Sequence, residues 1–182
     1  AFANNDSRDF DGLVDEARVF TFESGQFDPA RDLNYAVGTP DSVSLTVNAS
    51  GTTSFQEDVG SIRALSSLST DAAGATVIGS DVFTFGDQTY DDDVTITDPV
   101  TLKSDGDVIL GGNTDLGVNT LTLDVAGTAS EAVGTISGSG GLVKAGVGTL
   151  TLSGANGYGG ETVVEEGILK LNNASALGAS GS

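Results

Sequence analysis

The sequence predicts an all-β protein in which short strands wind into a β-solenoid. Three observations support this prediction: alternation of apolar and hydroxyl side chains from Ser42 onward, β-runs of only a few residues, and corners built from Gly, Asp and Ser. Gly accounts for 26 of the 182 residues, which suits a chain with many tight turns because Gly adopts positive φ without steric cost. Helical periodicity is absent from this region.

Residues 1–41 differ from the rest and are expected to form an irregular N-terminal cap or arm. The stretch from Asp6 to Asp15 is acidic and polar, and two of the three prolines lie between Phe27 and Pro40. Residues 42–182 are expected to form the solenoid.

The alternation begins at Val43, Leu45 and Val47, which are separated by Ser44 and Thr46. The further β-runs are Ile62–Leu68, Ala75–Ile78, Val82–Phe85, Val94–Ile96, Val100–Leu102, Val108–Leu110 and Leu121–Val125. Many short strands at even spacing are compatible with a sandwich, a barrel or a solenoid. The shortness of the runs and the scarcity of hairpin Asn-Gly turns favour the solenoid, with a sandwich as the alternative.

An internal repeat supports the same fold. The segment Gly148–Leu152 recurs further along the chain as Gly167–Leu171. The offset between the two segments is about one turn of a β-helix, so Leu150 is expected to stack on Leu169, and Leu152 on Leu171.

The region from about 137 to 178 resembles the autotransporter-associated β-strand repeat. The matching positions are the glycines, Lys144, Thr149 to Leu152, Asn156, Tyr158 and Thr162, and the departures are Gly157 and Glu161. The region from Ser42 to Val125 is similar, more loosely, to repeats of filamentous-haemagglutinin-like exoproteins, through Gly51–Phe55, Leu65–Leu68, Gly86–Tyr90 and Val94–Ile96. Together these resemblances imply a right-handed parallel β-helix of an autotransporter passenger, secreted or displayed on the bacterial cell surface.

Composition limits the chemistry and the partners. The chain has no Cys and no His, which removes thiol chemistry and the commonest general base. The net charge of −19 argues against nucleic acid as a partner, because binding it relies on neutralising phosphates. No run of 18 apolar residues exists, so no integral membrane helix is expected.

The densest charge, Asp91-Asp92-Asp93, is a candidate Ca²⁺ site because hard cations collect carboxylate oxygens. The competing interpretation is a solvated turn between Tyr90 and Val94, and no other cofactor is expected. Lys144 is expected to point outward and to pair with a carboxylate of a neighbouring coil.

These observations predict a non-enzymatic structural or adhesive solenoid, with copies of itself joined end to end as partners in an extracellular filament and a possible host or matrix ligand. One alternative is a surface module that binds Ca²⁺ or glycan on a Thr-lined face, such as that carrying Thr120 and Thr122 or Thr149 and Thr151. The other alternative is a carbohydrate-active β-helix enzyme using carboxylates such as Glu165 and Glu166. The lack of Trp platforms for sugar rings argues against the enzyme.

Overall fold

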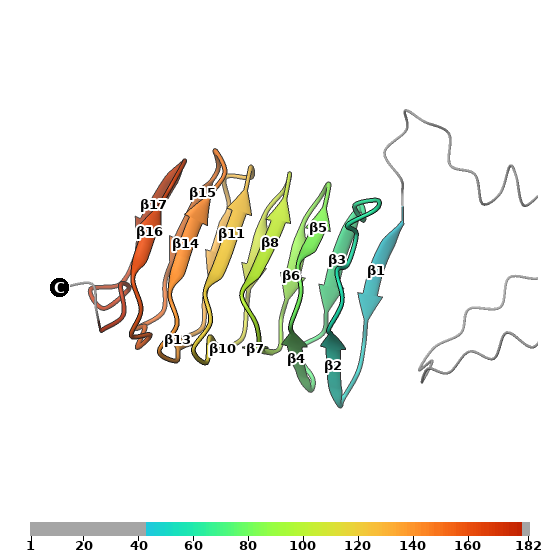
Figure 1. Ribbon diagram of the computed structural model, residues 1–182, viewed down its shortest axis with the longest axis horizontal. Helices are drawn as coiled ribbons and strands as arrows, with labels where there is room; N and C mark the ends of the chain where they lie inside the picture. Colours follow the sequence, from blue (N-terminus) through green and yellow to red (C-terminus); the bar gives the residue numbers. More distant parts are fainter. Residues whose placement is uncertain (1–42, 180–182) are drawn as a thin grey trace, which may run out of the picture. The chain divides into compact units, whose positions relative to one another are not determined.

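The computed structural model describes residues 43–179, which form a β-solenoid of stacked parallel strands (Figure 1). Every strand pairing in this part of the chain is parallel, and none of its residues is helical. The predicted all-β parallel solenoid is therefore confirmed. The expected cap or arm of residues 1–41 lies outside the described residues.

The strands form three sheets, and each coil contributes to them in turn. The seven-stranded first sheet consists, in spatial order, of β1 (Ser44–Val47), β3 (Ser67–Thr70), β6 (Gln88–Tyr90), β9 (Val108–Leu110), β12 (Ser130–Ala132), β15 (Thr149–Leu152) and β17 (Ile168–Leu171). The second sheet consists of β2 (Thr52–Phe55), β4 (Ala75–Ile78), β7 (Asp93–Ile96), β10 (Thr114–Asp115) and β13 (Ile136–Ser137). The third consists of β5 (Val82–Thr84), β8 (Val100–Ser104), β11 (Leu121–Val125), β14 (Leu142–Ala145) and β16 (Thr162–Val164).

The strand register sets the length of each coil, because a residue pairs with the residue one coil further along the chain. In the first sheet, Ser44 pairs with Ser67 of the next coil, and Leu68 pairs with Gln88. At the C-terminal end, Leu150 pairs with Leu169, and Leu152 pairs with Leu171, which confirms the predicted stacking of one repeat on the other. Each coil therefore adds one strand spacing, about 4.8 Å, along the axis of the solenoid.

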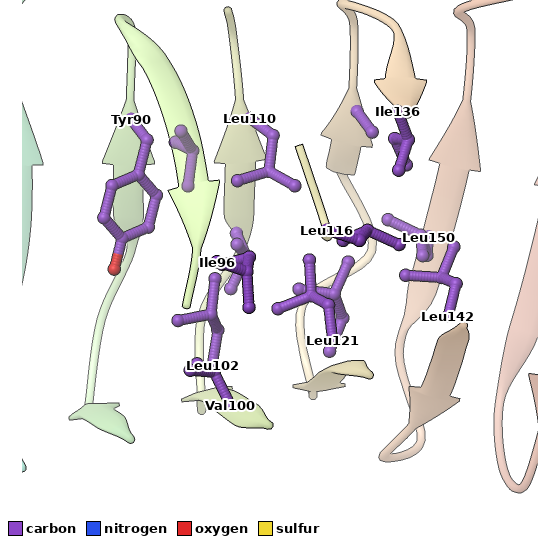
Figure 2. Close-up of a cluster of buried hydrophobic side chains, with 14 of the residues drawn as sticks. Tyr90, Ile96, Val100, Leu102, Leu110, Leu116, Leu121, Ile136, Leu142 and Leu150 are labelled. Atoms are coloured by element: carbon purple, nitrogen blue, oxygen red, sulfur yellow. The ribbon is translucent and has the colours of Figure 1, made fainter. Parts of the chain in front are cut away.

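The core is a column of apolar side chains inside the three sheets (Figure 2). Alternate residues of each strand point inward, so that Val100, Leu121 and Leu142 occupy the same register position in three successive coils and are all buried. A single coil cannot bury its own apolar face, and stability comes from the interfaces between neighbouring coils. Burying one such Leu side chain contributes roughly 1.5–3 kcal/mol.

The predicted β-run Ile62–Leu68 is wrong in its first half. In the first described coil, Val59 and Leu65 make isolated bridges to Val82 and Thr84 of β5. Residues 60–64 separate Val59 from Leu65, whereas Phe83 alone separates their partners. The chain therefore carries an insertion here, the inserted loop 60–64, in which Gly60 has a φ of 80° and Ile62 is fully exposed.

No helix in residues 43–179 is long and apolar enough to cross a membrane.

Candidate functional site

Of the three candidate Ca²⁺ ligands, Asp91 and Asp92 lie in the corner between β6 and β7, and Asp93 begins β7; their side chains do not converge. The side chain of Asp92 is buried, and its two carboxylate oxygens accept hydrogen bonds of 2.7 Å from the hydroxyls of Thr70 and Thr76 in the preceding coil. Asp91 and Asp93 are exposed, and Asp93 accepts hydrogen bonds from the backbone N–H (2.8 Å) and the side-chain amide (3.1 Å) of Asn113 in the next coil.

The alternation of the strands explains this separation. Gln88, Tyr90, Asp92, Val94 and Ile96 are all buried, so the inward positions continue through the corner without a break. Neighbouring carboxylates therefore face opposite sides of the wall. Within residues 43–179 no group of three Asp, Glu, His or Cys side chains is placed to hold a metal ion, and Ca²⁺ binding by Asp91, Asp92 and Asp93 is untested.

Other aspartates connect successive coils at their corners, and we call them the corner carboxylates. Asp58 accepts hydrogen bonds from the backbone N–H of Asp81 (3.3 Å) and the hydroxyl of Ser80. Asp81 in turn accepts from the backbone N–H of Thr101 at 2.7 Å in the following coil. At the ends of the strands, where ladder partners run out, these charge-assisted hydrogen bonds satisfy backbone donors.

A second column of corner carboxylates follows the same rule. Asp87 accepts from the backbone N–H of Asp107 at 2.9 Å, and Asp107 accepts from the backbone N–H of Ala129 at 2.8 Å. Gly127 lies directly above Asp107, and a Cβ at this glycine would lie 2.1 Å from the Asp107 oxygen. This role was not predicted from the sequence, although the spacing between Asp87 and Asp107 is close to one coil and could have indicated it.

Lys144 does not point outward, which corrects the sequence prediction. Its side chain is fully buried on the inward face of β14, in register with Leu123 of the preceding coil. The ammonium donates hydrogen bonds to the backbone carbonyls of Ala145 (2.5 Å), Gly146 (2.7 Å) and Glu166 (3.3 Å). Desolvation lowers the pKa of Lys144, because the charge lies in the wall of the core. The alternation from Leu142 was the signal that places Lys144 inward.

Three further buried polar side chains, Gln88, Tyr90 and Asn156, form hydrogen bonds in the interior. The Tyr90 hydroxyl donates to Oε1 of Gln88 at 3.1 Å, while the Gln88 amide donates to the carbonyls of Val82 and Lys103. Burial raises the pKa of Tyr90, and the nearby Asp92 carboxylate adds to this effect. In the C-terminal coils, Asn156 accepts from the backbone N–H of Ile136.

A pocket with a volume of about 240 Å³ lies beneath the inserted loop. It is lined by Gly60, Ser61, Ala64, Phe83, Thr84, Phe85, Lys103 and Asp105. At its margin, the Lys103 ammonium pairs with Asp124, and this hydrogen bond raises the pKa of Lys103. The pocket was not predicted from the sequence, because residues 62–64 of the inserted loop were interpreted as part of a strand.

Comparison with known proteins identifies a repeat in the C-terminal coils. Residues 142–171, from β14 to β17, match the family model of the passenger-associated-transport-repeat. This match confirms the prediction of an autotransporter passenger repeat. The chain is also similar to an adhesin, the BmaC autotransporter of Brucella suis biovar 1 (strain 1330), with 34% identity over 91 residues.

The match to this adhesin covers 47% of the present chain but only 3% of the length of the adhesin. No solved structure matches the chain significantly.

Proposed function

We propose that this chain is a segment of an exported bacterial surface protein, in which the β-solenoid serves as a structural and adhesive rod. The observation that carries the proposal is the unbroken parallel stacking that ends in a passenger-associated-transport-repeat at residues 142–171. The partial likeness to an autotransporter adhesin supports it.

The geometry suits a rod that holds binding surfaces away from a cell. Neighbouring coils pair along the three sheets, so added coils extend the rod without requiring a larger core. The corner carboxylates fix one coil to the next at the corners of the coils, where the sheets end. Residues inserted between the strands project from this frame, as the inserted loop does.

We assign the chain no catalytic role. A carbohydrate-active enzyme would need acidic side chains for catalysis. At the corners, these carboxylates instead accept hydrogen bonds from backbone N–H groups and hydroxyls. Glu165 and Glu166 are exposed beside β17. Incubation with acidic polysaccharides tests this assignment, because release of reducing ends or unsaturated sugars would contradict it.

Surface display tests the main proposal. We expect an adhesion-negative bacterium that displays the full chain on an unrelated export system to gain attachment to coated host matrix or epithelial cells. The control is the same export system carrying an unrelated β-solenoid of similar length. Equal attachment by both strains would contradict an adhesive role and leave only the structural one.

A second candidate function is end-to-end assembly. In the last described coil, Val164, Ile168 and Leu171 are 47%, 60% and 45% exposed, although Leu171 occupies an inward register position above Leu152. A further coil stacked on β16 and β17 would cover the inward-facing Val164 and Leu171, and we propose that a second copy supplies such a coil as readily as a continuation of the same protein does. Sedimentation and electron microscopy test this function: Leu171→Asp should abolish filaments, and a wild-type chain that stays monomeric at high concentration would rule it out.

A further inference from the structure

The inserted loop 60–64 and the pocket beneath it break the regular pattern of the solenoid. Gly60, Ser61 and Ala64 line one side of the pocket. In repeat proteins, residues inserted into a single repeat map to loops on one face, often the binding face.

The pocket is built from three successive coils, so its base is fixed by the sheet. The inserted loop belongs to the first coil, Phe83 to the second and Lys103 to the third, and Phe83 pairs with Lys103 in the parallel ladder. Beyond this pair, the backbone N–H of Asp105 donates to the carbonyl of Thr84. The side chains around the pocket are therefore held at spacings set by strand pairing.

The lining combines aromatic surface with hydrogen-bonding groups. Phe85 is 46% exposed and adjoins the half-buried Phe83 across one residue. Asp105 lines the pocket and is exposed, and its carboxylate interacts electrostatically with the Lys103 ammonium. Ser61 adds an exposed hydroxyl. A few polar groups at the edge of an apolar surface fix the orientation of a small ligand.

We propose that this pocket binds one neutral sugar ring of a glycan. The C–H face of a sugar packs on the phenyl rings, and two neighbouring hydroxyls donate to the Asp105 carboxylate, which has acceptor capacity for both. The net charge of −19 disfavours acidic sugars. This inference rests on the proposed adhesive function, to which it adds a ligand class.

The competing occupant is an apolar side chain of a partner protein. Ile62 favours it, because this side chain is fully exposed beside the pocket. Ile62 does not line the pocket, however, whereas Asp105 does, and an apolar side chain would remove water from that carboxylate without donating a hydrogen bond to it. The pocket therefore fits a ligand with hydroxyl groups better than it fits an apolar side chain.

Saturation-transfer NMR on the full chain tests the proposal with the methyl glycosides of neutral hexoses and N-acetylhexosamines as probes. We expect at least one probe to bind with a dissociation constant on the order of 1 mM, as a ligand of this size allows. Phe85→Ala and Asp105→Asn should each weaken binding about tenfold or more. The matched control is Val118→Ser, which changes a side chain 82% exposed at a corner outside the pocket, and it should leave binding unchanged.

No binding by any probe, or equal binding by all variants, overturns the inference. It is also overturned if the chain binds glycan-free host protein and this binding is lost in Ile62→Ser, since the occupant is then a protein. These results stay separate from the display experiment: attachment that survives Phe85→Ala refutes the pocket but keeps the adhesive rod. Circular dichroism of each variant verifies that the fold is intact.

Discussion

The buried hydroxyl of Tyr90 predicts a specific sensitivity to alkaline pH. The side chain lies inside the third described coil with no exposed surface, and it donates to Gln88. Because burial and the Asp92 carboxylate raise its pKa in the folded state, Tyr90 stays protonated there well above pH 10. In the unfolded chain the same hydroxyl loses its proton near pH 10.

The sign and size of the effect follow from proton linkage. Below pH 10 both states hold the proton, and the stabilising contribution of the raised pKa is fully present. Above pH 10 the unfolded state binds fewer protons than the folded state, so the free energy of unfolding falls by about 1.4 kcal/mol per pH unit. At pH 11.5 the expected loss is therefore about 2 kcal/mol for this one group.

Urea unfolding between pH 8 and pH 11.5 measures the loss, and Tyr90→Phe isolates the part due to Tyr90. The variant should be about 1 kcal/mol less stable at pH 8, because Gln88 loses its hydroxyl partner. This gap in the free energy of unfolding should close and then reverse as the pH rises, because only the wild type loses stability through Tyr90. The other titrating groups contribute equally to both proteins. A constant gap across the pH range would refute the assignment.

Three further predictions concern the polar groups of the wall. Lys144→Met keeps the length of the side chain but leaves three backbone carbonyls without their donor. In urea titrations it should lower the free energy of unfolding by about 2–4 kcal/mol. An unchanged free energy of unfolding would show that water replaces the ammonium. Asp107→Ala should lower the free energy of unfolding by about 1–2 kcal/mol, because the hydrogen bond to the backbone N–H of Ala129 is lost. The control Asp98→Ala, at an exposed position, should change it by no more than about 0.5 kcal/mol. Similar losses in both variants would contradict the role of the corner carboxylates. Millimolar Ca²⁺ should leave the melting temperature unchanged, because Asp92 faces the core while its neighbours face solvent, and a rise of several degrees would establish a site.

The regular part of the fold was predictable from sequence because it follows one rule. Alternation defines the inward face, and the recurrence of Gly148–Leu152 as Gly167–Leu171 defines the coil, so the stacking of Leu150 on Leu169 could be stated in advance. The same rule, applied through the corners, also places Asp92 and Lys144 inward. The sequence interpretation placed Asp92 in a turn and Lys144 on the outer surface. Charged residues are rarely buried, and only the structure shows the hydroxyls and carbonyls that satisfy these two.

The inserted loop could not be predicted because its residues have the apolar composition of a strand. The run from Ile62 to Leu68 is apolar enough to be interpreted as a β-run, yet the pairing of Val59 and Leu65 with β5 requires the residues between them to leave the sheet. In a solenoid, every residue that belongs to the repeat pattern either stacks on a neighbouring coil or forms a corner. A residue outside the repeat takes no part in stacking. The exposed Ile62 and the pocket beside it can therefore recognise a ligand without weakening the contacts between coils.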